Sequence, residues 1–184
     1  MGVRNILRLG DPVLRKKAEI LSMEEINSRQ TKELVDDMLQ TMQSVGGIGL
    51  AAPQIGVSKR LAVISIPADN QRYHNAPETP LIVIINPRIS ILSEKKQGYW
   101  EGCLSIPGMR GFVERPRKIQ VDFQDLKGEK QSLQLKGFLA TVFQHELDHL
   151  DGVLYVDHLK SMDKFCFEAE FREYYDKQNK NEAG

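Results

Sequence analysis

The chain has 184 residues, a length that suits one domain and leaves little room for a second. Hydrophobic residues make up 41% of it and charged residues 27%, as in an ordinary globular protein, and 25 basic residues balance 25 acidic ones, so charge gives no argument for a nucleic-acid or membrane partner. No apolar run approaches the ~20 residues of a membrane span, and residues 1–11 lack the apolar stretch of a signal peptide, so we expect one cytoplasmic domain, residues 1–184.

The first predicted helix lies in the N-terminal third of the chain. Ser22 and Glu25 have the spacing of a capping box, in which each side chain bonds the other residue's backbone N–H. Gly46 and Gly47 are expected to end the helix. Between these signals, apolar residues recur at spacings of one and three and predict a single buried face: Leu34, Val35, Met38, Leu39 and Met42.

Short strands are predicted in the middle of the chain. They are closely spaced and mostly not separated by helices, which favours antiparallel or mixed sheets over a βαβ array. The polar, Pro-containing stretch 67–80 is expected to be an exposed, mobile loop. The strand-like segments alternate or are rich in β-branched residues, and they cover residues 60–66, 81–85, 88–92, 118–123 and 132–135.

Two more helices are predicted after these strands. One opens at Gly137 and can end at Gly152, and an amphipathic one runs from about residue 161 to 175. The last residues, 179–184, are polar and expected to fray. The fold class is therefore α+β, with antiparallel or mixed sheets packed around the helix that starts at Gly137, an N-terminal helix and a C-terminal helix.

The strongest chemical signal is the His-Glu-x-x-His pattern at residues 145–149. His145 and His149 lie four residues apart, so on a helix their imidazoles point the same way and can bind one metal ion. Glu146 can then act as a general base toward water at that ion. The alternative is two helical histidines without a metal, a pattern that arises by chance in roughly one chain of this length in a hundred.

A catalytic site of this kind needs a third protein ligand and an open position. His158 follows without the glycine-containing spacer of the metzincins, and His74 lies in a polar loop, so both are expected to be ordinary surface or core residues. Cys103 is the better candidate, because Gly102 before it allows close approach and a thiolate binds borderline metals well. Cys166 is expected to be a small buried hydrophobe, not a disulfide partner.

The small-residue segment 47–56 is ambiguous when read alone. It superficially resembles a phosphate loop but lacks both the G-x-x-x-x-G-K-[ST] pattern and the third Gly of G-x-G-x-x-G. Small residues there could equally let a backbone pass close to a ligand. Gln54 carries an amide donor that could stabilise an oxyanion, although the residue type alone gives a catalytic glutamine little support.

Taken together, these segments resemble the peptide deformylase family. Its three motifs are present in order: GxGxAAxQ at residues 47–54, EGCLS at 101–105 and QHExDHLxG at 144–152. The likeness extends to residues 6–14, to 85–87 and to the C-terminal helix of bacterial members, so it covers nearly the whole chain. Three separate motifs are far more specific than the histidine pattern alone.

The resemblance implies a metallo-hydrolase of protein biosynthesis, built as one catalytic domain. Such enzymes remove the formyl group from the N-terminal formylmethionine of newly synthesised proteins and release formate. Cys103, His145 and His149 become the metal ligands, with Glu146 as general base and then acid. Gln54 and the backbone N–H of Leu104 would form the oxyanion hole. The residues implied to line or flank the methionine pocket are Ile48, Gly49, Glu101, Arg110, Phe138, Thr141, Val142 and His145, although Phe138 and Val142 read equally well as helix core.

The implied cofactor is one Fe²⁺ per chain, which Zn²⁺, Ni²⁺ or Co²⁺ can replace in purified protein. The implied partners are N-formylmethionyl nascent peptides, and association with the ribosome is compatible with that substrate. Asp148 lies between the two histidine ligands in sequence, and we expect it to form a structural ion pair with an arginine such as Arg115 rather than to act in catalysis.

Two other interpretations remain open. A zinc peptidase of the HExxH kind would need a third His or Glu ligand at standard spacing, and none is present there. A non-enzymatic module would use the metal structurally, but structural zinc sites usually have four protein ligands and only three are predicted.

Overall fold

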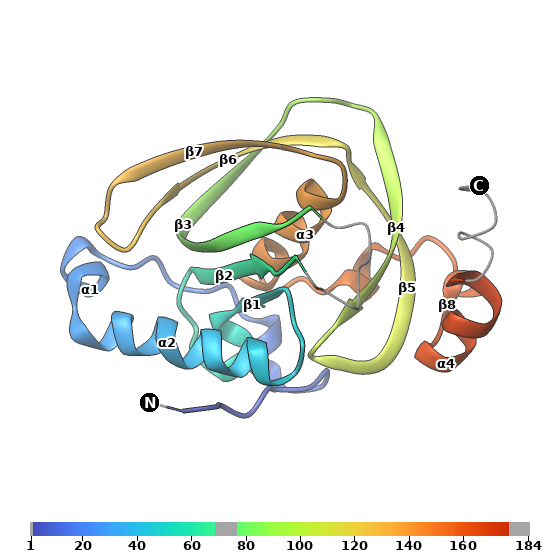
Figure 1. The fold of residues 1–184 in the computed structure, drawn as a ribbon, viewed down its shortest axis with the longest axis horizontal. Coiled ribbons are helices and arrows are strands. Elements are labelled where there is room, and N and C mark those ends of the chain that lie inside the picture. The colour runs from blue at the N-terminus through green and yellow to red at the C-terminus, as the bar shows by residue number, and fades with distance from the viewer. Residues whose placement is uncertain (1, 69–76, 177–184) are drawn as a thin grey trace.

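The computed structural model describes residues 2–68 and 77–176, so residues 69–76 of the expected loop and the expected frayed end, 179–184, lie outside the described residues. The chain folds as the α+β class predicted from sequence (Figure 1). Its helices and strands are α1 (Met23–Asn27), α2 (Arg29–Ser44), β1 (Gly49–Ala51), β2 (Leu61–Ile66), β3 (Thr79–Ile91), β4 (Lys96–Cys103), β5 (Ile106–Pro116), β6 (Lys118–Gln124), β7 (Lys130–Lys136), α3 (Gly137–His149), β8 (Phe165–Phe167) and α4 (Glu168–Phe171).

The strands form two antiparallel sheets, as expected. One has the order β1-β2-β3-β6-β7 and the other the order β4-β5-β8. Helix α3 contacts strands of both sheets, so it holds the centre of the molecule, while α2 packs beside β1 and β2 (Figure 1). A central helix clamped between two sheets is a rigid support for side chains on its remaining face.

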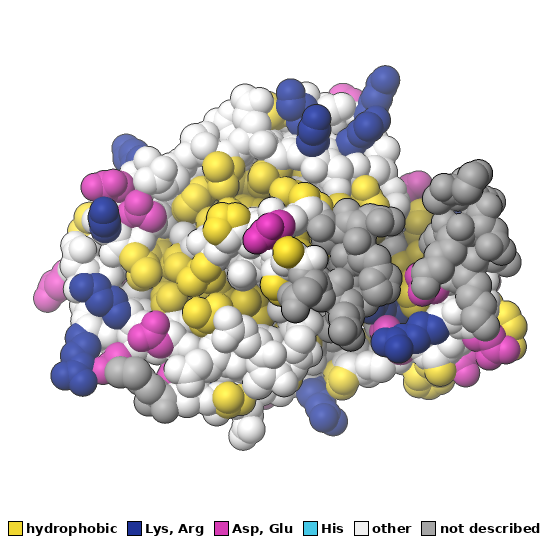
Figure 2. Space-filling view, viewed as in Figure 1, with side chains coloured by type: hydrophobic (Ala, Val, Ile, Leu, Met, Phe, Trp, Pro, Cys, Tyr) yellow, Lys and Arg dark blue, Asp and Glu magenta, His cyan; other side chains and the backbone are white. Residues whose placement is uncertain are grey.

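Strand β2 shows why the two helices pack where they do. Side chains alternate along a strand, so Ala62 and Ile64 join the core around α3, while Leu61 and Val63 join the core around α2. All four have no exposed surface, and burial of the three larger side chains, Leu61, Val63 and Ile64, contributes about 1.5–3 kcal/mol each. Apolar side chains also gather at the surface near the middle of the view in Figure 2. Leu81 of β3 is 42% exposed.

The predicted N-terminal helix is present but divided in two. The capping box is confirmed, because Glu25 N–H donates to Ser22 Oγ at 3.2 Å and Ser22 N–H donates to Glu25 Oε2 at 2.7 Å. It opens only the short α1, however. Ser28 is extended and its Oγ accepts from Thr31 N–H, so a second cap starts α2, which carries the predicted apolar face. Gly46 lies at φ +63, a left-handed conformation that follows the end of α2.

The segments predicted at residues 81–85 and 88–92 are one strand, β3. Its ladder shifts between Ile85 and Arg88, where Asn86 adopts φ 51. The Asn86 side-chain amide donates to Leu21 O at 2.8 Å and to Gln124 Oε1 at 2.9 Å, which satisfies it inside this bulge. The Asn-Pro pair therefore bends a continuous strand instead of separating two.

The predicted C-terminal helix over residues 161–175 is wrong in its extent. The chain instead makes a 3₁₀ turn at Met162–Lys164 and then strand β8, and helical structure begins only at Glu168. Strand β8 pairs with Met109–Gly111 of β5. This ladder satisfies backbone groups that a helix would have satisfied internally, so pairing with a distant strand overrides the local amphipathic pattern.

The N-terminal segment is tied to α2 through Asp37. Gly2 N–H donates to Asp37 Oδ1 at 2.6 Å, and the Arg4 guanidinium donates to Oδ2 at 2.6 and 2.8 Å. The Asp37 side chain is only 3% exposed. The Gly2 N–H and then the Arg4 guanidinium therefore hold the pKa of this carboxyl below its usual value.

We expect Asp37→Asn to lower the free energy of unfolding by about 1–2 kcal/mol at neutral pH, because hydrogen bonds to a charged group are lost. A carboxyl with a depressed folded-state pKa stabilises the fold above its unfolded pKa, near ~3.9, and this contribution disappears as the pH falls through the folded-state value. Urea unfolding of both proteins at pH values from about 7 down to about 2.5 tests this. A difference in stability that does not shrink at acid pH would contradict it.

Candidate active site

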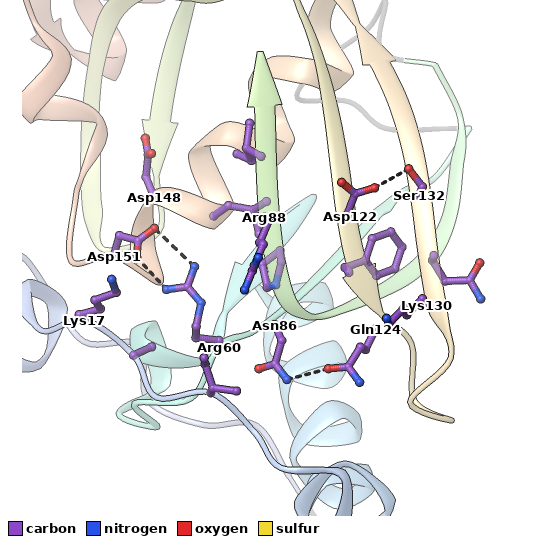
Figure 3. Close-up of a pocket in the computed structure, with 17 residues that line it drawn as sticks. Lys17, Arg60, Asn86, Arg88, Asp122, Gln124, Lys130, Ser132, Asp148 and Asp151 are labelled. Atoms are coloured by element: carbon purple, nitrogen blue, oxygen red, sulfur yellow. Dashed lines mark hydrogen bonds and ion pairs between the residues drawn. The ribbon is translucent and has the colours of Figure 1, made fainter. Parts of the chain in front are cut away.

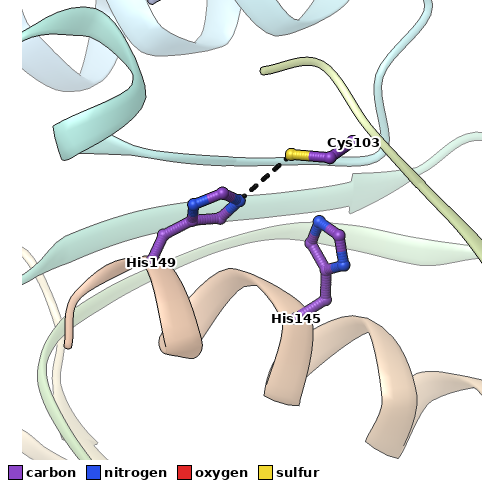
Figure 4. Close-up of side chains that lie close together, drawn as sticks. All are labelled: Cys103, His145 and His149. Atoms are coloured by element: carbon purple, nitrogen blue, oxygen red, sulfur yellow. Dashed lines mark hydrogen bonds between the residues drawn. The ribbon is translucent and has the colours of Figure 1, made fainter. Parts of the chain in front are cut away.

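Three side chains with metal-binding atoms meet between β4 and α3. The Sγ of Cys103 and ring nitrogens of His145 and His149 all lie within 4.8 Å of one another, and Cys103 Sγ is 3.3 Å from His149 Nε2 (Figure 4). The ring centres of His145 and His149 are 5.3 Å apart, as expected for side chains on neighbouring turns of one helix. The structure thus brings Cys103 to the two histidines, as the sequence predicted.

The donor set suits a bound cation. Burial raises the pKa of the Cys103 thiol. The imidazoles of His149 and His145 lower this pKa by more than burial raises it, so it lies well below its usual value. A buried thiolate with two imidazoles is a donor set for zinc or ferrous iron, and three protein ligands leave a position open. The three residues therefore fit the metal that the sequence implied.

A buried network of charges orients His145. Its Nδ1 lies 2.8 Å from Glu101 Oε2, which leaves Nε2 free to act as the ligand atom. Arg115 donates to both Glu101 oxygens, at 2.6 and 3.0 Å, and to Asp148 at 2.7 Å. The expected Asp148–Arg115 ion pair is confirmed. Burial penalises the charge of Glu101, but the hydrogen bonds of His145 and Arg115 keep its pKa below the usual value.

His158 and Cys166 lie outside the trio. His158 is 38% exposed and bonds Asp148 through Nε2 at 2.8 Å, which is the surface role expected of it, while His74 lies outside the described residues. Cys166 is a free thiol on β8 and is half-buried, not buried as its apolar neighbours suggested, because β8 is an edge strand of the three-stranded sheet.

Glu146 lies beside the trio in a dry environment. It is 6% exposed, and its Oε2 has no hydrogen-bond partner among the described residues. Burial raises its pKa to about 7, and a cation at the neighbouring trio would lower it. A side chain at Gly49 would collide with the Glu146 carboxylate, so only glycine lets β1 pass this close.

Gln54 sits on the opposite side, in the 3₁₀ turn Ala52–Ile55. Its Oε1 accepts from Ala51 N–H at 2.8 Å, so the amide is oriented with Nε2 toward the trio. Nε2 lies 3.2 Å from Ser105 Oγ and 3.5 Å from Cys103 Sγ. The segment that resembled a phosphate loop is therefore a short strand and a turn that present a polarised N–H beside the trio.

Two small adjoining cavities open beside the trio, and they share Ile48, Gly102, His145 and Glu146. Most residues expected in the pocket line one or both of them. Arg110 does not, because its buried guanidinium lies behind Gly102. Two lining residues were missed, Tyr99 and Trp100. Recognition of strand β4 in the sequence could have identified them, but its glycines obscured the alternation of apolar and polar residues that marks a strand. The first cavity is lined by Gly47, Ile48, Gly49, Gln54, Gly102, Cys103, Leu104, His145 and Glu146, and the second by Ile48, Tyr99, Trp100, Glu101, Gly102, Phe138, Thr141, Val142, His145 and Glu146.

A much larger hollow, of ≈ 1350 Å³, lies elsewhere (Figure 3). It is lined by β3, β6, β7 and the end of α3, and none of the three ligand residues reaches it. Its charges are mixed and partly paired, with Arg60 bonded to Asp151 at 2.7 Å and Ser132 to Asp122 at 2.6 Å. Among the described residues that line this hollow, no group of metal-binding side chains comparable to the trio is present.

Comparison with known proteins points to the same metallo-hydrolase family as the geometry of the site. The family model for polypeptide deformylase matches residues 3–165. Peptide deformylase of Leptospira biflexa is 50% identical over 91% of this chain and 93% of its own length, and peptide deformylase 2 of a Nostoc species is 41% identical over 95% and 96%. The Met-Ala-Ser-bound class I type b enzyme of Acinetobacter baumannii superposes with a TM-score of 0.82 at 39% identity, over 85% of this chain and 98% of that one.

The family match decides between the interpretations that the sequence left open, against a peptidase of internal bonds and against a structural metal module. None of the helices in the described ranges is long and apolar enough to cross a membrane. The chain belongs to the peptide deformylase family, the metallo-hydrolases that remove the N-formyl group from nascent peptides.

Proposed function

We propose that this deformylase acts on N-formylmethionyl peptides through Cys103, His145 and His149 as ligands of one Fe²⁺ and Glu146 as general base. The observation that carries the proposal is the meeting of a thiol and two imidazoles within 4.8 Å beside a buried carboxylate oxygen with no partner among the described residues. A basic group held next to a metal position is the arrangement that water activation needs.

The residues divide the chemistry between them. The metal, when bound, supplies Lewis-acid polarisation and lowers the pKa of a water molecule. Glu146 takes the proton of the attacking water and returns it to the leaving amine. The Nε2–H of Gln54 and the backbone N–H of Leu104 stabilise the negative charge that develops on the formyl oxygen. The orientation of Gln54 by Ala51 N–H supports this role, because a donor held in place needs no reorganisation during the reaction.

The second cavity takes the methionine side chain in this proposal. Ile48 and Val142 supply apolar surface in this cavity. The peptide backbone runs along Gly49 of the adjoining first cavity as an added strand in this proposal. Glu101 shapes the pocket from beside His145, and Arg110 supports it from behind Gly102. A thioether is slim, flexible and polarizable, which suits a narrow apolar slot.

The metal assignment predicts a clear order of activities. Protein stripped of metal should be inactive. Reloading without oxygen should give the highest kcat with Fe²⁺, which would be lost in air, because ferrous iron beside a thiolate oxidises readily. Formate release from formyl-Met-Ala-Ser after reloading with Fe²⁺, Ni²⁺, Co²⁺ or Zn²⁺ is the measurement. Activity with zinc and none with anaerobic iron would overturn the iron assignment.

The substrate also bears on where the enzyme works. Formylated N-termini belong to newly made chains, so we propose that residues 1–184 act as one catalytic domain in the cytoplasm and associate with the ribosome. Co-sedimentation with ribosomes carrying a formylated nascent chain, at two salt concentrations, tests the association. Equal recovery in the supernatant with and without ribosomes would contradict it.

A further inference from the structure

The C-terminal segment, defined as residues 161–176, is fastened to the sheet that borders the substrate pocket (Figure 1). Beyond the β5–β8 ladder, Arg110 Nε donates to Glu168 Oε2 at 2.6 Å and its Nη2 to Oε1 at 3.1 Å. Arg110 is 3% exposed, and its guanidinium also lies 5.5 Å from the ring centre of Phe171. Because two hydrogen bonds join the carboxylate to the buried guanidinium, they fix the orientation of the Arg110 side chain as well as its distance from Glu168.

A second attachment is aromatic and reaches Trp100 of β4. The ring centre of Trp100 lies 4.6 Å from that of Tyr175 and 5.2 Å from that of Phe171, and it meets Phe112 of β5 edge-on at 5.9 Å. Aromatic pairs prefer particular ring geometries and contribute more than the burial of their area, so these contacts favour one arrangement of the rings. Trp100 is therefore enclosed by one strand partner and two rings of the C-terminal segment.

Both attachments end on the pocket wall. Trp100 lines the second cavity, and Gly102 lines both. A Cβ at Gly102 would lie 3.1 Å from Arg110 Nη1, so the guanidinium closes the outer side of the backbone there. The residue between them, Glu101, bonds His145. The stretch of β4 from residue 100 to 102 is thus held on its outer side by the C-terminal segment and presents its inner side to the pocket.

We propose that the C-terminal segment is a positioning element for recognition of the substrate's first side chain. Tyr175 and Phe171 hold Trp100, and Glu168 holds Arg110 against Gly102. Together they keep the β4 wall close enough to grip a methionine side chain. The proposal rests on the proposed assignment of the second cavity to that side chain. It predicts that loosening these contacts weakens binding and discrimination, and leaves the chemical step alone, because none of these groups touches the trio or Glu146.

The test compares neighbouring residues of the same segment. Tyr175→Ala removes a ring from Trp100, whereas Tyr174→Ala removes a side chain that is 57% exposed and makes no ring contact with another described residue. Glu168→Gln weakens the hold on Arg110, whereas Glu170→Gln changes an exposed carboxylate on the same short helix. Tyr175→Phe keeps the ring and should restore wild-type behaviour.

We expect Tyr175→Ala and Glu168→Gln to raise KM for formyl-Met-Ala-Ser about three- to tenfold with kcat within about twofold of wild type. The preference for formyl-Met over formyl-Ala peptides, as the ratio of kcat/KM values, should fall by a similar factor. Tyr174→Ala and Glu170→Gln should change neither. Circular dichroism and metal content verify that each variant is folded and loaded.

Equal kinetic values for each variant and its neighbour control would overturn the proposal, and so would a loss confined to kcat. A wild-type enzyme with no preference between formyl-Met and formyl-Ala would instead overturn the assignment of the pocket. Should Tyr175→Ala fail to fold, the nearly isosteric change Glu168→Gln against Glu170→Gln decides the question alone.

Discussion

Replacing Glu146 by glutamine is expected to lower kcat for formyl-Met-Ala-Ser by about two to four orders of magnitude, the contribution typical of a positioned acid–base group. Glutamine has nearly the same shape but cannot accept the proton of the attacking water. The carboxylate is 6% exposed, and its Oε2 has no partner among the described residues, so no recorded hydrogen bond diverts that oxygen from the reaction.

Metal content decides what a loss of activity in Glu146→Gln means. Glu146 lies beside the ligand trio but is not part of it, so the variant should bind one equivalent of metal as the wild type does. Stopped-flow or steady-state kinetics with metal analysis on the same sample separates the two effects. A kcat within about tenfold of wild type, with metal bound, would show that another group carries the proton.

The metal trio could be predicted in part because some of its geometry is local. The pitch of a helix places His145 and His149 on one face whatever surrounds them. Cys103 was chosen from the chemistry of a thiolate, the glycine before it and the resemblance of residues 101–105 to the family motif, because its position in space depends on the hairpin of β4 and β5. Glycines such as Gly98 and Gly111 interrupt the alternation of that hairpin, so its strands were not predicted.

The charge network around the trio shows a second limit. The pair between Asp148 and Arg115 was predicted and is confirmed. The sequence did not show that Arg115 also binds Glu101, because that contact depends on how β4 pairs with β5. It also did not show that Glu101 orients His145, because that contact depends on how β4 packs against α3. A side chain with several donors has several candidate partners, and only the tertiary arrangement selects among them.

The C-terminal segment shows the limit most clearly. Its apolar spacing predicts one helix, but Phe165–Phe167 extend the three-stranded sheet. A strand at a sheet edge gains its hydrogen bonds from a partner far away in sequence, and no local pattern reports that partner. The same non-local packing buries Arg110 under Glu168, which is why a residue implied to flank the pocket lies behind its wall.

Gln54→Ala is expected to lower kcat and kcat/KM together by about two to three orders of magnitude with metal still bound, since one oxyanion donor is worth that much. The effect should fall on kcat because the hydrogen bond strengthens as charge develops on the formyl oxygen, while the ground-state carbonyl gains little from it. The side chain is 1% exposed and anchored by Ala51 N–H, so alanine also leaves that N–H without its partner.

A matched control comes from the neighbour that shares the Gln54 amide. Ser105 Oγ lies 3.2 Å from Gln54 Nε2, and Ser105→Ala removes one restraint on the donor but keeps the donor itself. Its kcat should stay within about tenfold of wild type, because the anchor at Ala51 remains. Nearly normal kcat in Gln54→Ala would remove Gln54 from the oxyanion site. Equal losses in both variants would mean that the polar pair acts as a unit, with the hydroxyl as important to the orientation of the donor as the backbone anchor.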